Sequence, residues 1–191
     1  MSDQHDPAGH DDLHEQTLSS EFVYDGRVVN LYLDTVRLPN GKTARRELIR
    51  HPGAVAIVPV DAEGSVILVR QFRYAAGRVL WEVPAGTLEP DEDPNVCAHR
   101  ELQEEIGHKA GKLERLGGIF VAPGYTSEFI HLYLATDLSE SRLEGDSDEF
   151  IQVERFSWRE VLRKIRSGEI EDGKSISSLF LARDYLTRDR D

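Results

Sequence analysis

Short runs that alternate between apolar and polar residues follow a polar N-terminal segment. This period of two predicts strands with one buried face, at residues 22–24, 28–36 and 44–50. Asp25-Gly26 and Asn40-Gly41 separate the runs, and such pairs favour tight hairpin turns. We therefore expect a small antiparallel β subdomain over residues 18–50. Residues 1–17 show no apolar period and are expected to form a disordered tail.

Beyond residue 50 the pattern changes to apolar, β-branched runs interleaved with helical periods. Strands are expected at residues 54–60, 66–71, 80–83, 112–120, 128–136 and 150–157. Helices are expected at residues 94–106, 158–167 and 175–186. The order lacks regular βαβ repetition, so it predicts a mixed α/β sandwich over residues 51–191 rather than a doubly wound parallel sheet.

The helix expected at residues 94–106 has clear limits. Asp93 is suited to cap it, Pro94 fits its first position and Gly107 fits a left-handed stop. Residues 98, 102 and 106 are apolar and recur at the helical period, so they should form the buried stripe. The limits and the stripe together define which face remains for polar side chains.

Three glutamates crowd into one turn of this helix. Glu101 and Glu105 are four residues apart, and Glu104 lies beside them. Like charges at this spacing repel by only a few tenths of a kcal/mol, about 0.2–0.5, so a solvated acidic face is one interpretation. The other is a cluster of oxygen ligands on a rigid element, of the kind that Mg²⁺ binds.

The net charge, the cysteine count and the lengths of the apolar runs limit which classes of partner are expected. The net charge of −12 argues against a nucleic-acid binder but not against a phosphorylated substrate carried with a cation. The single cysteine, Cys97, excludes an intrachain disulfide and fits a reducing cytoplasm; with no base beside it, we expect it to pack rather than react. No apolar run reaches the roughly 18 residues of a membrane helix, and the N-terminus lacks signal-peptide features. We expect a cytoplasmic protein without membrane or nucleic-acid partners.

A longer pattern encloses the three glutamates. Gly86, Glu92 after five residues, and after seven more the run Arg100-Glu-Leu-Gln-Glu-Glu-Ile-Gly107 resemble the Nudix box of the Nudix hydrolases. Eight of the nine defined positions match. The exception is His108, where the box has a bulky aliphatic residue, and we expect this change to affect packing at the helix exit only.

The resemblance implies a Nudix α/β/α sandwich with a mixed sheet, and hydrolysis of a diphosphate with Mg²⁺, or with Mn²⁺ or another divalent cation. The implied metal ligands are the Ala85 carbonyl, Glu101, Glu104 and Glu105. Arg100 is expected to orient a glutamate such as Glu92 through a bidentate pair. Glu92, Arg100 and Glu104 therefore belong to the expected catalytic set.

Stretches outside the box are similar to the ADP-ribose pyrophosphatase subfamily, at residues 45–47, 71–73, 81–86, 122–128 and 168–174. The similarity implies hydrolysis of ADP-ribose to AMP and ribose 5-phosphate by a homodimer with shared sites. Arg46 and Glu47 would reach the adenine side across the interface, Arg73 a phosphate or the adenine edge, and Glu128 the terminal ribose. Glu82 would contact the ligand through its carboxylate. For each of these residues alone, a surface salt bridge is the alternative.

The acidic loop at residues 139–149 contains Gly145 and is suited to a lid. The subfamily uses a loop glutamate to help activate water, and position before the strand at residues 150–157 favours Glu149. Glu144, Asp146 and Asp148 are alternatives, as is a loop that is merely solvated.

Two other functions stay open. One is the same chemistry on another nucleoside diphosphate sugar, such as GDP-mannose or ADP-glucose. The other is a regulator that keeps the fold and binds a ligand without catalysis, although the intact box glutamates and the absence of a basic DNA-reading segment count against it.

Overall fold

The chain forms two units. The computed structural model describes residues 13–145 and 149–188. One unit takes its described residues from the chain up to His51 together with Ala122–Glu128, and the other from Pro52–Val121 and Phe129 onward. The division falls one residue beyond the expected position at residue 50. The return of Ala122–Glu128 to the first unit was not part of that expectation, because chain order alone does not reveal it.

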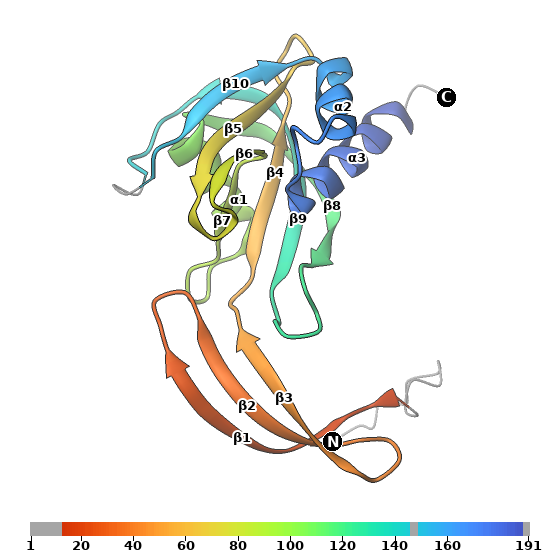
Figure 1. The fold of residues 1–191 in the computed structure, drawn as a ribbon. Helices are drawn as coiled ribbons and strands as arrows, with labels where there is room; N and C mark the ends of the chain where they lie inside the picture. The colour runs from red at the N-terminus through yellow and green to blue at the C-terminus, as the bar shows by residue number, and fades with distance from the viewer. Residues whose placement is uncertain (1–12, 146–148, 189–191) are drawn as a thin grey trace, which may run out of the picture. The chain divides into compact units, whose positions relative to one another are not determined.

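The first unit is an antiparallel sheet in the order β1 (Gln16–Asp25), β2 (Asn30–Arg37) and β3 (Thr43–Arg50) (Figure 1). The second hairpin closes as the Asn-Gly pair predicts, with Gly41 at φ 81° and its N–H donating to Leu38. β1 starts six residues before the run expected at residue 22 and includes the last two residues of the expected tail. Every residue of β1 is exposed.

In its described residues, the second unit contains seven strands and three α-helices. The strands are β4 (Ala54–Pro59), β5 (Val66–Arg73), β6 (Arg78–Glu82), β7 (Ala85–Thr87), β8 (His108–Phe120), β9 (Phe129–Glu140) and β10 (Gln152–Phe156). The helices are α1 (Pro94–Glu105), α2 (Trp158–Arg166) and α3 (Gly173–Arg188). A 3₁₀ turn, Tyr74–Ala76, connects β5 to β6. Within the described residues, no helix is long and apolar enough to cross a membrane.

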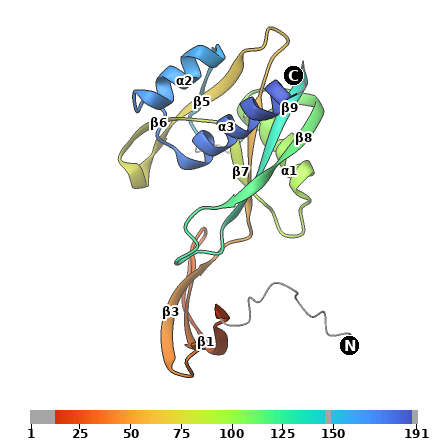
Figure 2. The same cartoon turned by 90° about the vertical axis from the view of Figure 1, so that its right-hand side faces the viewer.

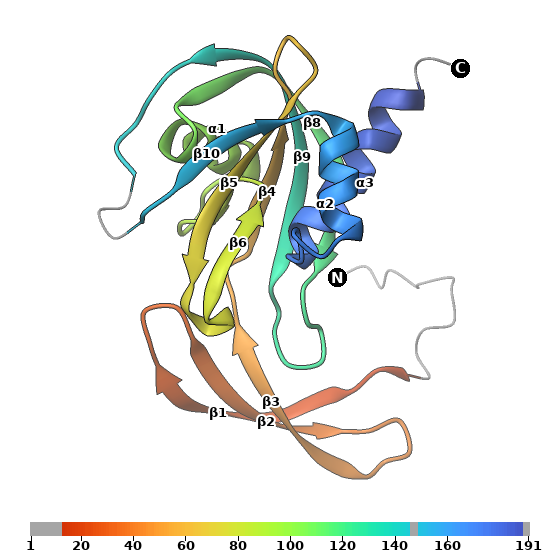
Figure 3. The ribbon, with the colours of Figure 1, turned by 45° about the horizontal axis from the view of Figure 1, so that its top comes forward.

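The strands of this unit form two sheets, in the orders β7-β4-β9-β8 (Figure 1) and β10-β5-β6 (Figure 3). β4 and β9 are parallel, whereas the other pairs are antiparallel, so the mixed sheet is confirmed. β7 was not predicted, because three residues are too few to show a period.

β4 lies between two apolar clusters, which explains its continuous run of apolar residues. Val55 and Ile57 pack in the cluster that includes Leu102 of α1, while Ala56 and Val58 pack in the cluster that includes Leu179 of α3. Figures 1 and 2 show α1 on one side of β4 and α2 with α3 on the other. The α/β/α sandwich is thus confirmed, and it fixes α1 firmly against the sheet.

Candidate active site on the glutamate helix

The ends of α1 are fixed by the expected residues. The Asp93 side chain accepts a hydrogen bond from the Asn95 N–H at 2.8 Å, and Pro94 occupies the first turn. Gly107 ends the helix at φ 68°, where a side chain would be strained. His108 Nδ1 lies 2.7 Å from the Ile106 carbonyl, so the one departure from the box sits at the helix exit.

Burial distinguishes two of the glutamates from an ordinary acidic face. Ala98 and Leu102 are fully buried, as the stripe predicts. Glu101 and Glu105 are also buried, at 8% and 7% exposure, whereas the Glu104 side chain is 21% exposed. A solvated face therefore does not describe Glu101 and Glu105, because burying a carboxylate is costly unless something compensates it.

Arg100 connects the carboxylates. Its Nε and Nη2 donate to the two carboxylate oxygens of Glu92, each at 3.0 Å, which is the bidentate geometry expected. Its Nη1 donates to Glu101 at 2.6 Å and to Glu104 at 2.9 Å. The hydrogen bonds from Arg100 lower the pKa of Glu92 to about 2, against the effect of burial. One guanidinium thus holds three box glutamates in a fixed arrangement.

The backbone of β7 approaches these carboxylates closely. A Cβ at Gly86 would lie 1.8 Å from Glu101 Oε1, so the carboxylate occupies the space that any side chain would need. The Ala85 N–H donates to Glu105 Oε1 at 3.3 Å. Glu105 Oε2 is buried and has no hydrogen-bond partner within the described part of the chain. Gly86 thereby allows Glu101 and Glu105 to face the β7 backbone.

The negative charges of Glu101 and Glu105 are not fully compensated by nearby positive groups. Burial raises the pKa of Glu101 to about 7, although the charge of Arg100 opposes it. Burial raises the pKa of Glu105 well above its usual range, and the charge of Glu101 adds to the shift. The charge of Glu149 contributes to both shifts, so its carboxylate lies near enough to interact with them.

These residues fit a divalent cation. A carboxylate oxygen without a partner and a second buried carboxylate supply hard oxygen ligands. No three His, Cys, Asp or Glu side chains among residues 13–145 and 149–188 already form a metal site. Mg²⁺ is commonly held by one or two carboxylates together with waters and substrate phosphates.

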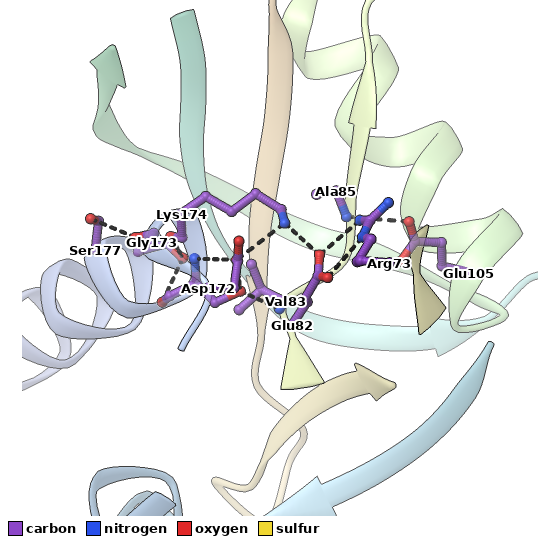
Figure 4. A network of polar contacts seen from close by, with 11 residues as sticks. Arg73, Glu82, Val83, Ala85, Glu105, Asp172, Gly173, Lys174 and Ser177 are labelled. Carbon is purple, nitrogen blue, oxygen red and sulfur yellow. Dashed lines mark hydrogen bonds and ion pairs between the residues drawn. The ribbon is translucent and has the colours of Figure 1, made fainter. Parts of the chain in front are cut away.

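Arg73 and Glu82, which were expected to contact the ligand, form an ion pair with each other in the structure. Arg73 Nε and Nη2 donate to the two Glu82 oxygens at 2.8 and 2.7 Å (Figure 4). The Glu82 side chain is 1% exposed and also accepts from Lys174 Nζ. Glu82 is therefore engaged by two cations rather than open to a ligand. Lys174 was missed, although the stretch at residues 168–174 was noted.

The remaining expected substrate contacts lie in the first unit. Arg46 and Glu47 line one pocket with Gly124 and Tyr125. Arg46 is held by Glu15, through bonds of 2.9 and 2.6 Å. Glu128 follows the same segment, which is attached to β3 by backbone bonds such as Ile49 N–H to the Tyr125 carbonyl at 2.8 Å. The structure thus groups Arg46, Glu47 and residues 122–128 in the first unit.

The acidic loop reaches α1. The Leu143 N–H donates to the Gln103 carbonyl at 3.3 Å, and Glu144 and Gly145 line a pocket with Glu104. Asp146 and Asp148 lie outside the described residues. Of the two alternatives that are described, Glu144 and Glu149, Glu149 is the one whose charge contributes to the pKa shifts of Glu101 and Glu105.

Cys97 is buried beside this site, in surroundings that oppose ionisation of its thiol. Its thiol lies 3.7 Å from the Thr87 carbonyl, and burial raises its pKa. A thiolate is the nucleophilic form of cysteine, so a raised pKa opposes a nucleophilic function.

Two family models match adjacent parts of the chain. The NUDIX domain model matches residues 50–179, which is most of the second unit. The chain belongs to the NUDIX domain family. The model described as the nucleoside diphosphate sugar hydrolase N-terminal domain matches residues 15–49. The two matches meet where the first unit passes to the second.

Several known proteins are similar to this Nudix protein along most of their length. An ADP-ribose pyrophosphatase of Bacillus subtilis (strain 168) is 42% identical over 165 residues, 85% of this chain and 89% of the relative. A methanol dehydrogenase activator of Bacillus methanolicus is 42% identical, with coverage of 85% and 89%. A GDP-mannose pyrophosphatase of Salmonella arizonae is 35% identical, with coverage of 77% and 82%.

A solved structure is similar as well. The crystal structure of an ADP compounds hydrolase matches with a TM-score of 0.83 and 27% identity, covering 92% of this chain and 95% of that one. The hydrolase fold and the family are therefore established for this chain, and divalent cations are the general cofactors of such enzymes.

Proposed function

We propose that this chain hydrolyses the diphosphate of ADP-ribose, releasing AMP and ribose 5-phosphate, with Mg²⁺ as its cation. The observation that carries the proposal is a pair of buried carboxylates, Glu101 and Glu105, that face the β7 backbone. Their negative charge is not fully compensated by the protein, and one oxygen of Glu105 has no hydrogen-bond partner among the described residues. The 42% identity to an ADP-ribose pyrophosphatase supports the choice of substrate.

The cation would be held by Glu101, Glu105, Glu104 and the Ala85 carbonyl. When bound, it neutralises charge on the diphosphate and on the leaving oxygen. Arg100 holds Glu92, Glu101 and Glu104 in place through hydrogen bonds. Their carboxylates therefore keep their positions while charge develops on the diphosphate during the reaction.

Water attacks one phosphorus in line, and the bond from that phosphorus to the bridging oxygen breaks. Glu149 accepts the proton of the attacking water, a role supported by its electrostatic effect on Glu101 and Glu105. The positive charge of Arg73 stabilises the negative charge of the diphosphate. Glu128 contacts the terminal ribose, and Arg46 with Glu47 contacts the adenine side.

A homodimer would complete the site, with the first unit of one chain serving the catalytic unit of its partner. The exposed β1 supports this assembly, since Phe22, Val23 and Tyr24 of that strand are each more than half exposed. A cytoplasmic location is supported by the single cysteine, which is buried and free.

Purified protein assayed with ADP-ribose and Mg²⁺ should release AMP, and Glu105→Gln should abolish turnover while remaining folded. Absence of AMP release by the wild type would refute the substrate. Full turnover by Glu105→Gln would refute the assignment of the cation site.

Another nucleoside diphosphate sugar is the second candidate, supported by the similarity to a GDP-mannose pyrophosphatase. Comparison of kcat/KM for ADP-ribose, ADP-glucose, GDP-mannose and NADH decides between them. A regulator without catalysis would bind one of these compounds and hydrolyse none.

The shared site can be tested by complementation. Arg46→Ala and Glu105→Gln are each expected to be inactive, but heterodimers of the two contain one intact site. After subunit exchange, about a quarter of the sites should be active. No recovery, or a mass by light scattering that corresponds to an active monomer, would contradict the shared site.

A further inference from the structure

The buried carboxylate of Glu82 is held by cations from two distant parts of the chain. Arg73 of β5 binds both of its oxygens, and Lys174 of α3 binds Oε2 at 2.5 Å (Figure 4). Burial raises the pKa of Glu82, but Arg73 and Lys174 outweigh this effect and the net shift is downward. Glu82 is therefore a fully compensated buried charge, unlike Glu105.

Lys174 is itself held by the first turn of α3. Its Nζ also donates to Asp172 at 3.1 Å, and Asp172 in turn accepts from the Ser175 N–H and Oγ. Ser175 Oγ accepts from the Val83 N–H at 2.9 Å. The start of α3 thus fixes two consecutive residues, Glu82 and Val83, which only Pro84 separates from β7.

Arg73 is left with one edge available. Arginine has five N–H donors, and the pair with Glu82 uses Nε and one N–H of Nη2. Within the described residues its other N–H groups have no hydrogen-bond partner, and its side chain is 40% exposed. Hydrogen bonds to Glu82 chiefly raise the pKa of Arg73, and the charge of Glu105 also contributes, so Arg73 lies near the cation site.

The bond from Lys174 adds an orientation that the Arg73–Glu82 pair alone lacks. A bidentate pair is planar, but the terminal torsion of a glutamate is broad, so the plane can rotate about that bond. A third donor on Oε2 removes this freedom. The open edge of Arg73 then faces one direction, as an anion-binding group requires.

We propose that Lys174 is a positioning residue for the substrate diphosphate, acting through Glu82 on the open edge of Arg73. This assignment rests on the proposed function, since a diphosphate is the anion that Arg73 would meet. It also gives the stretch at residues 168–174 a purpose, because its last residues, Asp172 and Lys174, form the clamp.

The test is a double-mutant cycle of Lys174→Met and Arg73→Ala, assayed with ADP-ribose and Mg²⁺. Lys174→Met should raise KM about tenfold and change kcat less than about threefold. Added to Arg73→Ala, it should have almost no further effect, because its action passes through Arg73. Lys174→Arg should recover most of the loss. Additive effects in the cycle, or a wild-type KM for Lys174→Met, would overturn the proposal.

Two further measurements separate positioning from folding and from the choice of substrate. Arg163→Met removes the exposed bond to Glu169 in the same stretch and should leave KM unchanged. If Lys174→Met does not fold, Lys174→Ser takes its place in the cycle, because its side chain is polar but too short to donate to Glu82.

Hydrogen exchange of the Arg73 Nε–H requires no substrate. It should be slow in the wild type and at least about tenfold faster in the Lys174 variant. If the wild type releases no AMP, the proposed function fails while exchange still tests the clamp; equal exchange in both proteins would refute the clamp itself.

Discussion

A single methyl group at Gly86 should disable the site without unfolding the protein. The added Cβ would lie 1.8 Å from Glu101 Oε1 and 1.9 Å from its Cδ, so the carboxylate must move. Ordinary contact begins at 3.4 Å, which requires a displacement of about 1.6 Å. The displaced atoms are the end of a flexible side chain, so the backbone of β7 need not change.

The magnitude follows from the position of Glu101. Mg²⁺ requires oxygen ligands at about 2.0–2.1 Å in near-ideal geometry. A misplacement of 1 Å at a catalytic site costs about 100-fold. We therefore expect Gly86→Ala to lower kcat/KM for ADP-ribose by about 100-fold or more.

The loss of stability should be moderate. The displaced carboxylate loses its charge-assisted hydrogen bond to Arg100, worth about 1.5–3 kcal/mol. Replacing glycine by alanine returns about 0.4–1 kcal/mol through the unfolded chain. The net cost is about 0.5–2.6 kcal/mol, so the melting temperature should fall by no more than about 10 °C.

The assay is AMP release with Mg²⁺, with thermal unfolding measured on the same samples. Gly173→Ala is the matched control, since its Cβ would meet nothing within 4 Å. A folded Gly86→Ala with wild-type kcat/KM, or an equal loss in Gly173→Ala, would show that the close approach of β7 to Glu101 does not matter.

Four other variants test the same site and its support. Arg100→Lys should lower kcat at least about tenfold with the fold intact, because lysine cannot bind Glu92 bidentately and reach the other glutamates as well; circular dichroism and steady-state rates check this. Leu102→Ala should cost about 2–5 kcal/mol in urea denaturation, because the side chain is fully buried between α1 and the sheet. Glu105→Gln should stabilise the metal-free protein by about 1 kcal/mol while turnover is lost, since it removes a buried charge with an unpartnered oxygen; a lower melting temperature would contradict this. The pKa of Glu92 is lowered to about 2 when folded, so its contribution to stability is present at neutral pH and disappears as pH falls from its unfolded value toward 2; the stability difference from Glu92→Gln, measured by denaturation, should shrink over that window.

The sequence predicts α1 and its box because their determinants are local. Asp93, Pro94 and Gly107 act within a few residues of the backbone they terminate, and the apolar stripe repeats along one element. The spacing of Gly86 to the helix was informative for the same reason. Such features depend on short-range geometry, which a linear pattern records directly.

Pairings between residues far apart in the sequence could not be predicted from the pattern of apolar and polar residues. Glu82 was expected to contact the ligand, but its partner Lys174 is 92 residues away, and only the packing of α3 brings them together. The return of Ala122–Glu128 to the first unit likewise depends on backbone bonds to β3. Neither partner is implied by hydrophobic period or turn chemistry, because both pairings form between elements.

Two of the buried carboxylates of the second unit, Glu82 and Glu105, show how function and support can be distinguished. Glu82 has both oxygens paired and two cations beside it, so a further ligand would have to displace existing bonds. Glu105 is as buried but keeps an unpartnered oxygen and lies close to a second acidic group, so the folded chain leaves it uncompensated. Burial of that kind opposes folding, and a cation that binds only the folded state would offset it. This difference supports the proposals that Glu105 binds a cation and that Glu82 positions Arg73.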